Sequence, residues 1–254
     1  MSRRRLVSAT CLVPPATGTT GKLGATLRLY RALRRDPHDP ATRILIETET
    51  LLGIYGHRKI RVADVADACG FSAANVYRYF PSRRALLDTL ASHYLRETER
   101  SALACAARRG HSARDRLSGF LIGLNMALTS VSDSEPRVGE LIADAAAERW
   151  PCYCDYDALV LRRIAKILTA ASASGEFRLE GDAGQEARRV KAAACALLEP
   201  DVIRLCRDRH DVRTREALSR LIAAALMNRP ASPGCASPHA DSYQTLTTGE
   251  MRCP

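Results

Sequence analysis

Residues 60–84 are IRVADVADACGFSAANVYRYFPSRR and contain two apolar patterns of helical spacing, separated by a short turn. Three residues form the first pattern: Val62, Val65 and Ala66. This spacing predicts a short helix over 62–68. Gly70 can adopt positive φ and end that helix, and the hydroxyl of Ser72 can cap the start of a second helix.

The second helix has an inward face and an abrupt end. Val76 and Phe80 lie four residues apart, so both side chains point to the same side of the helix. Pro81 makes it hard for the helix to continue, because its nitrogen carries no hydrogen and its ring crowds the preceding turn. Residues 62–81 therefore predict two helices joined by a tight turn containing glycine, which is a helix-turn-helix.

Six residues remain on or near the outer side of the second helix: Ala73, Ala74, Asn75, Tyr77, Arg78 and Tyr79. In this motif the second helix enters the major groove of DNA with its N-terminal residues nearest the base edges. Alanine methyls permit close approach and can meet a thymine methyl, and Asn75 can bond to a base edge or a phosphate. The three longer side chains are expected to reach phosphates, with packing of Tyr79 against the first helix as the alternative. Arg83, at the start of the following helix, is expected to add a phosphate contact.

The sequence around this motif resembles the TetR family of bacterial transcriptional regulators. The resemblance covers roughly residues 40–90: ATRILIE in the first helix, VADVADACGFS across the turn, NVYRYFPS through the second helix and RRALL where the next helix starts. It implies a three-helix DNA-binding domain over 40–88. It also implies a variable all-helical domain that follows, holds a small-molecule effector pocket and forms a homodimer.

Two positions depart from the family pattern. The family often has threonine or serine where its second helix begins, whereas this chain has Ile60 and Arg61, and a phosphate contact is assigned to Arg61. Some members carry a long side chain that reaches a base where this chain has Ala63, so specificity is expected to rely on Asn75, apolar contacts and DNA shape. The expected DNA-contacting residues are Arg61, Ser72, Ala73, Ala74, Asn75, Tyr77, Arg78, Tyr79 and Arg83.

The rest of the central chain also has helical periodicity, which predicts an all-α fold. A first helix ends at Gly56, and a long helix after the motif ends at Gly110. Further helices are expected at 112–130, 136–149, 155–174, 184–209 and 212–228. Pro200 should kink or split the helix that contains it. Residues 89–228 are expected to form the helical effector-binding and dimerisation domain.

The two ends differ from this central part in composition. Residues 1–39 are basic and predict a flexible leader, with a DNA-touching arm or a surface-seeking basic helix as alternatives. Residues 229–254 are rich in proline, serine and threonine and predict a disordered tail. The formal net charge is +10, but eight positive charges precede the first acid, Asp36, which leaves +2 for the remainder. The high pI alone is therefore weak evidence for DNA binding, whereas the acid-free stretch between Asp67 and Asp88 favours an anionic partner.

Other classes of protein find little support in the sequence. No apolar run approaches the roughly 20 residues that span a bilayer, and the N-terminal apolar stretch is too short and broken for a signal peptide, so a cytoplasmic location is expected. No motif of nucleotide-binding, metalloprotease or serine-hydrolase chemistry occurs, and no enzyme activity, cofactor or metal site is expected. Cys152 and Cys154 are assigned to packing, with a metal or redox role as the alternative. His57 is interpreted as an ordinary polar residue.

The expected function is that of a homodimeric repressor that binds a double-stranded DNA operator and is released by a small-molecule effector. The alternative is a non-specific or architectural DNA-binding protein that uses the basic leader. The dimer face is expected on the last two long helices, with six apolar candidates: Leu197, Leu198, Ile203, Leu218, Leu221 and Ile222. Three aromatic residues are expected in the core, with an effector pocket as the alternative: Trp150, Tyr153 and Tyr156.

Overall fold

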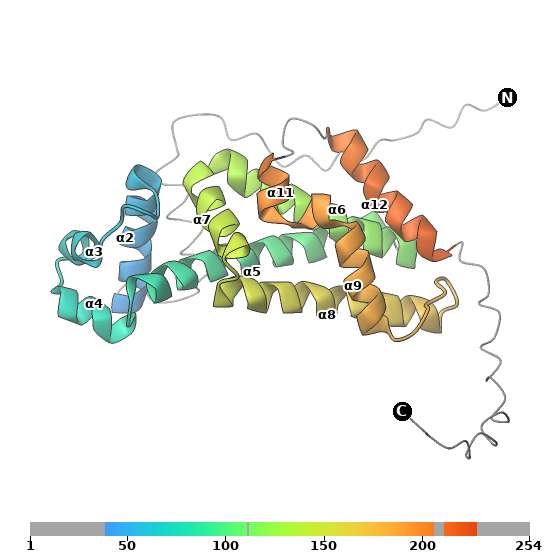
Figure 1. Ribbon diagram of the computed structural model, residues 1–254, viewed down its shortest axis with the longest axis horizontal. Helices are drawn as coiled ribbons and strands as arrows, with labels where there is room; N and C mark the ends of the chain where they lie inside the picture. Colours follow the sequence, from blue (N-terminus) through green and yellow to red (C-terminus); the bar gives the residue numbers. More distant parts are fainter. Residues whose placement is uncertain (1–38, 111, 206–210, 228–254) are drawn as a thin grey trace, which may run out of the picture.

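The computed structural model describes residues 39–110, 112–205 and 211–227, and every regular element in these ranges is an α-helix. The expected leader, apart from Asp39, and the expected tail lie outside the described residues. The predicted helix-turn-helix forms one end of an elongated molecule, and the remaining helices form a longer body beside it (Figure 1). Within the described ranges, no helix is long and apolar enough to cross a membrane.

Three short helices form the helix-turn-helix unit: α2 Pro40–Tyr55, α3 Val62–Cys69 and α4 Ala73–Tyr79. Asp39 caps α2 by accepting a hydrogen bond from the Thr42 N–H at 3.0 Å. Gly70 ends α3 with φ of 66°, a backbone conformation that residues with side chains rarely adopt. The Ser72 hydroxyl oxygen accepts from the Asn75 N–H at 3.2 Å and starts α4. Gly70 therefore ends α3 and Ser72 caps α4, as predicted.

A small apolar core holds these three helices together. Ile44 of α2, Val65 of α3 and Val76 of α4 are completely buried. Phe80, directly after α4, is also buried, which confirms the inward placement predicted for Val76 and Phe80. Helices of this length are marginal in isolation. The shared core, at about 1.5–3 kcal/mol for each buried apolar side chain, is therefore what keeps α4 folded.

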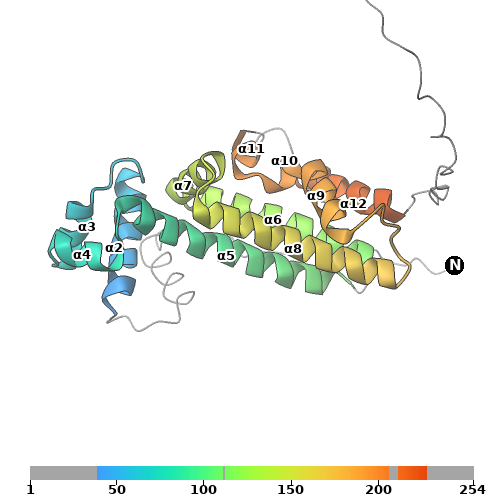
Figure 2. The same ribbon diagram turned by 60° about the horizontal axis from the view of Figure 1, so that its bottom comes forward.

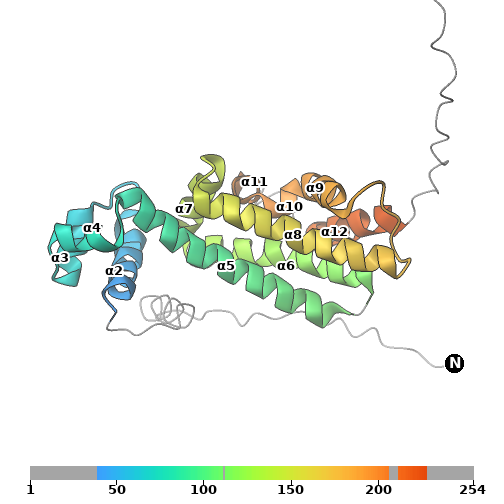
Figure 3. The ribbon, with the colours of Figure 1, turned by 90° about the horizontal axis from the view of Figure 1, so that it is seen from below.

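Three long helices form the length of the body: α5 Arg83–Arg109, α6 Ala113–Ser134 and α8 Pro151–Ala173. They lie side by side (Figures 2 and 3). The boundary expected between residues 88 and 89 falls inside α5, which starts at the helix-turn-helix unit and continues into the body. A Cβ added at Gly123 of α6 would lie 2.9 Å from the Cα atom of Ala102, so glycine permits the close approach of α6 to α5.

Shorter helices complete the body: α7 Pro136–Ala147, α9 Ala183–Ala193, α10 Cys195–Leu198, α11 Pro200–Leu205 and α12 Val212–Met227. α7 packs against α2 as well as against the body, so it joins the two parts of the molecule. The split expected at Pro200 is confirmed, because proline has no N–H and its ring forces Glu199 into an extended conformation with ψ of 119°. The helix expected over 184–209 is also interrupted at Ala194, where no proline or glycine in the sequence indicates a break.

Half of the residues expected at the dimer face are wrong for that role. Leu197, Leu198 and Ile203 are 0%, 4% and 7% exposed within the single chain, so they cannot meet a second copy. Their helices pack against α6, where the Asn125 side-chain amide donates to the Leu197 carbonyl at 3.1 Å. Leu221 on α12 is 66% exposed and keeps its place as a candidate.

The aromatic residues of α8 and the turn before it lie in the core, as expected: Trp150, Tyr153 and Tyr156. The Tyr153 hydroxyl donates to the Glu199 carboxylate. Cys152 is buried and Cys154 is half-buried, which agrees with their assignment to packing.

Candidate nucleic-acid interface

The outward face of α4 carries large side chains that no other described residue covers. Five residues of this face are exposed and are called the recognition surface: Ala73, Ala74, Tyr77, Arg78 and Tyr79. Tyr77 and Tyr79 are 49% and 38% exposed. Among the described residues, Tyr77 and Arg78 have no hydrogen-bond or ion-pair partner. Tyrosine is enriched at interfaces, because its ring supplies apolar contact and its hydroxyl supplies a hydrogen bond.

Ser72 and Asn75 lie at the N-terminal edge of the recognition surface. Ser72 is exposed, and its hydroxyl oxygen accepts from the Asn75 N–H. The hydroxyl hydrogen of Ser72 can still be donated to an acceptor such as a phosphate oxygen. Asn75 is half-buried, so its side chain has less reach than the exposed residues beside it.

A second basic stretch precedes α3. Arg61 is exposed, and its backbone N–H donates to the Asp64 carboxylate at 3.1 Å, so α3 is capped without use of the Arg61 guanidinium. Lys59 is also exposed, although no sequence motif marks it. Neither cation pairs with an acid among the described residues. Both line an open depression of about 830 Å³, whose lining residues are Leu51, Tyr55, Arg58, Lys59, Ile60, Arg61, Asp64 and Arg83.

Arg83 is half-buried and bonds to the chain itself. Its Nε donates to the Ile60 carbonyl at 2.7 Å, and one terminal nitrogen donates to the His57 carbonyl. These bonds attach the loop between α2 and α3 to the start of α5. A phosphate contact from Arg83 remains a prediction. It would have to use the guanidinium N–H groups that do not donate to these two carbonyls.

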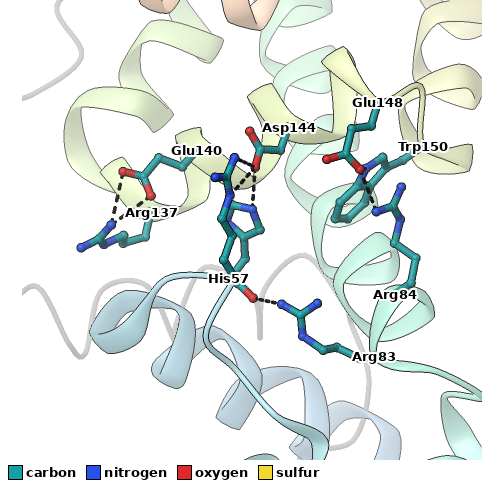
Figure 4. Close-up of polar contacts among 9 residues, drawn as sticks. His57, Arg83, Arg84, Arg137, Glu140, Asp144, Glu148 and Trp150 are labelled. Atoms are coloured by element: carbon teal, nitrogen blue, oxygen red, sulfur yellow. Dashed lines mark hydrogen bonds and ion pairs between the residues drawn. The ribbon is translucent and has the colours of Figure 1, made fainter.

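His57 is buried, and the interpretation of it as an ordinary polar residue misses its role. Its Nε2 atom lies 2.8 Å from Oδ2 of Asp144 on α7, and Arg58 donates to the same oxygen at 2.8 Å and 3.1 Å (Figure 4). Burial alone would raise the pKa of Asp144, but the hydrogen bonds from Arg58 and His57 outweigh burial and lower it. No local signal could predict this cluster, because 87 residues separate His57 from Asp144.

A polar cluster inside the body is satisfied by the chain itself. The Glu199 carboxylate pairs with Lys191 and accepts from the Tyr153 hydroxyl. Burial alone would raise the pKa of Glu199, but hydrogen bonds from these two partners lower it. Burial and the neighbouring Glu199 raise the pKa of Tyr153, which keeps its hydroxyl protonated as a donor.

The arrangement of α2, α3 and α4 agrees with one family of regulators. A family model described as bacterial regulatory proteins of the tetR family matches residues 44–90, from α2 into the first turns of α5. The helix-turn-helix unit of the chain is a TetR-type DNA-binding domain. The matched segment contains the whole recognition surface, and the predicted helix-turn-helix DNA-binding domain is therefore confirmed.

Solved structures share the fold of this chain over about three quarters of its length. A protein of unknown function from Rhodococcus sp. RHA1 aligns with a TM-score of 0.57 and 19% identity, over 76% of this chain and 100% of that chain. The fatty acid degradation regulator FadR from Bacillus halodurans aligns with a TM-score of 0.54 and 12% identity, over 76% of this chain and 97% of that chain. FadR from Bacillus subtilis, in complex with stearoyl-CoA, aligns with a TM-score of 0.53 and 14% identity, over 73% of this chain and 97% of that chain. At these identities the likeness shows the fold alone, and no curated protein matches the chain.

Proposed function

We propose that this TetR-family regulator represses transcription by occupying a pseudo-palindromic operator as a homodimer. The exposed recognition surface carries the proposal. Ala73 and Ala74, at the N-terminal end of α4, would lie against base edges, where small side chains allow the helix to enter the major groove. Tyr77 and Arg78, one turn further on, would donate to phosphates at the groove wall.

The basic stretch before α3 supplies a second set of phosphate contacts in this proposal. Arg61 and Lys59 are exposed and lack acidic partners among the described residues, so both charges are available to an anion. Each phosphate neutralised by such a cation releases about 0.9 of a counterion from duplex DNA, which makes the contact visible in the salt dependence of binding.

The dimer would form through the outward side of α12. Leu221 is 66% exposed, and Leu218 and Ile222 beside it on α12 are half-buried. A two-fold interface of this kind would present two recognition surfaces about 34–36 Å apart, one turn of DNA. Leu221→Glu should convert the dimer to a monomer in light scattering at micromolar concentration, and Arg162→Glu at an exposed position of α8 should not. A Leu221→Glu variant that stays dimeric would contradict this interface.

A small molecule bound in the body would release the dimer from DNA. The Bacillus subtilis FadR of the same fold is solved in complex with stearoyl-CoA, so proteins of this fold can bind a small molecule. Release requires only that the ligand prefers the dimer state whose recognition surfaces do not fit both half-sites, by about 1–3 kcal/mol in typical cases. Thermal-shift screening of metabolites, with stearoyl-CoA as one of them, followed by displacement of labelled operator, tests this part of the proposal.

The proposed function is tested by selecting duplexes from a random-sequence library with the full-length protein. The selected duplex and a scrambled duplex are then titrated at several salt concentrations. A sequence-specific regulator should bind the selected duplex about a thousandfold or more tightly than the scrambled one. Equal affinities with a steep salt dependence would instead support the alternative, a non-specific DNA-binding protein that uses the basic leader.

A further inference from the structure

Asp144 on α7 is the point where two basic side chains of the helix-turn-helix unit meet the body (Figure 4). Nε2 of His57 and two nitrogens of Arg58 all lie within 3.1 Å of its Oδ2 atom. The side chain of His57 is 7% exposed, and that of Arg58 is 79% exposed. The buried histidine contact therefore defines the geometry of this junction, because an exposed ion pair alone is weak and mobile.

The same loop is held from its other side by α5. Arg83, the first residue of α5, donates to the carbonyls of His57 and Ile60. His57 is thus bound through its ring by α7 and through its backbone by α5. A change in the position of α7 relative to α5 would break or move one of these two attachments.

The start of α5 is itself fixed to the corner between α7 and α8. The Arg84 guanidinium lies 3.6 Å from the centre of the Trp150 ring and donates to Glu148 at 3.0 Å. Asp88, one turn further along α5, accepts from the Cys152 backbone N–H at 3.0 Å. The loop between α2 and α3 is therefore attached through Arg83 to a part of α5 that contacts the corner between α7 and α8, and Asp144 holds the same loop from α7.

We propose that Asp144 is a positioning residue that fixes the orientation of the helix-turn-helix unit on the body and thereby sets the half-site spacing that the dimer accepts. The two recognition surfaces of a dimer are joined only through their bodies. A change of one base pair in spacing moves the second half-site by about 3.4 Å and rotates it by about 35° around the DNA axis. A rigidly held unit cannot follow that change, and a loosened one can.

This inference rests on the proposed function, and the lowered pKa of Asp144 supports it. A carboxyl that ionises below its ordinary value of about 3.9 is a charged acceptor throughout the neutral range in which DNA binding is measured. Glu140 provides a matched control, because it lies one turn earlier on α7 and its carboxylate pairs with Arg137 of the same helix at 3.0 Å. Removing the charge of Glu140 should leave the junction intact.

The experiment uses the duplex selected by the wild-type protein as its probe. Its two half-sites are placed at the selected spacing and at spacings one and two base pairs longer and shorter, and a duplex with one half-site is included. Kd is measured for the wild type, Asp144→Asn and Glu140→Gln. For the wild type and Glu140→Gln, a change of one base pair should raise Kd about tenfold or more, since the second half-site rotates by about 35°.

Asp144→Asn should lower this spacing penalty at least about threefold while it changes Kd for the single half-site by less than about twofold, because looser attachment costs orientation rather than base contacts. Arg58→Ala, an exposed change that leaves no cavity, is the second variant and should lower the penalty about twofold. An unchanged penalty in both variants would overturn the inference. So would equal weakening of half-site and full-site binding, because Asp144 would then act on the integrity of the helix-turn-helix unit. A wild type that enriches no duplex at all would overturn the proposed function as well.

Discussion

Two groups of aromatic side chains in this chain have opposite environments. Tyr77 and Tyr79 of the recognition surface are 49% and 38% exposed, and no described residue bonds to the Tyr77 hydroxyl. In the body, Trp150 and Tyr153 are buried, and the polar atom of each has a partner within the chain. The Trp150 Nε1 atom donates to Glu148 at 2.9 Å, and the Tyr153 hydroxyl donates to Glu199.

This difference in burial and hydrogen bonding distinguishes residues that stabilise the fold from residues that are available to bind a partner molecule. A buried ring with a satisfied polar atom contributes its interaction energy to folding. An exposed ring whose polar atom has no partner among the described residues contributes little to folding. Its apolar surface and its hydroxyl are available to contact DNA. Substitutions in the body should therefore lower stability, and substitutions in the recognition surface should lower affinity for DNA.

The largest effect is expected from Trp150→Ala. Truncation of a buried tryptophan typically lowers the free energy of unfolding by about 3–5 kcal/mol, and here it also removes the ring against which Arg84 packs. Urea unfolding monitored by circular dichroism measures the change. Tyr77→Ala in the same assay should lie within about 0.5 kcal/mol of the wild type. A Trp150→Ala loss below about 1 kcal/mol would remove the contrast between the two groups.

Arg78→Ala should weaken operator binding without a change in stability. Loss of one hydrogen bond to a charged group such as a phosphate costs about 1.5–3 kcal/mol, which is a rise in Kd of about tenfold to 150-fold. Fluorescence anisotropy with the selected duplex measures it. Arg162→Ala on the exposed face of α8 removes the same side chain from the body and should leave Kd unchanged. Equal losses in the two variants would mean that net charge, rather than the recognition surface, carries affinity.

Tyr153→Phe should lower the free energy of unfolding by about 1–2 kcal/mol, because the half-buried Glu199 carboxylate loses a hydrogen-bond donor. Operator affinity of the folded variant should stay at the wild-type value. Tyr55→Phe, at an exposed tyrosine, is the control and should leave stability unchanged. A Tyr153→Phe variant as stable as the wild type would show that the hydroxyl contributes nothing to the fold.

The stabilisation from Glu199 should also depend on pH in a definite direction. Lys191 and Tyr153 lower the pKa of Glu199 against the opposing effect of burial. A carboxyl with a lowered folded pKa stabilises the protein above its unfolded value of about 4.3, and this contribution is lost as pH falls through the folded value. The stability difference between wild type and Glu199→Gln should therefore be constant from about pH 8 to about pH 5 and shrink below about pH 4. A difference that shrinks already at neutral pH would contradict the pairing.

The smallest effect is expected from Lys59→Ala. Loss of one phosphate contact should raise Kd a few fold and make the slope of log K against log salt shallower by about 0.9. Lys166→Ala, at an exposed lysine of α8, should change neither quantity. An unchanged slope for Lys59→Ala would place the depression before α3 outside the DNA interface.

The helix-turn-helix unit was predictable from sequence because its signals are local. Gly70, Ser72 and Val76 each act within one turn of helix, through a positive φ, a cap and an inward face. The dimer face was not predictable in the same way. Leu197 and Leu198 belong to an apolar helix face, and such a face can pack within its own chain or against a second copy. The packing of α10 on α6 places both side chains in the core of their own chain.

The junction at Asp144 could not be predicted from sequence at all. The order of the residues gives no sign that His57 and Asp144 meet, since the contact depends on how α7 is placed against α2. Lys59 had only its charge as a signal, and a lone exposed lysine is usually a solvated one. Its position on the rim of the depression beside Arg61 becomes visible only in three dimensions.

Tyr77→Ala separates a role of the recognition surface in DNA binding from a role in the fold. Kd for the selected duplex and the melting temperature are measured on the same preparations of wild type and variant. We expect a rise in Kd of about tenfold or more with a melting temperature within about 2 °C of the wild type. An unchanged Kd, or a loss of binding that is matched by a loss of stability, would contradict it.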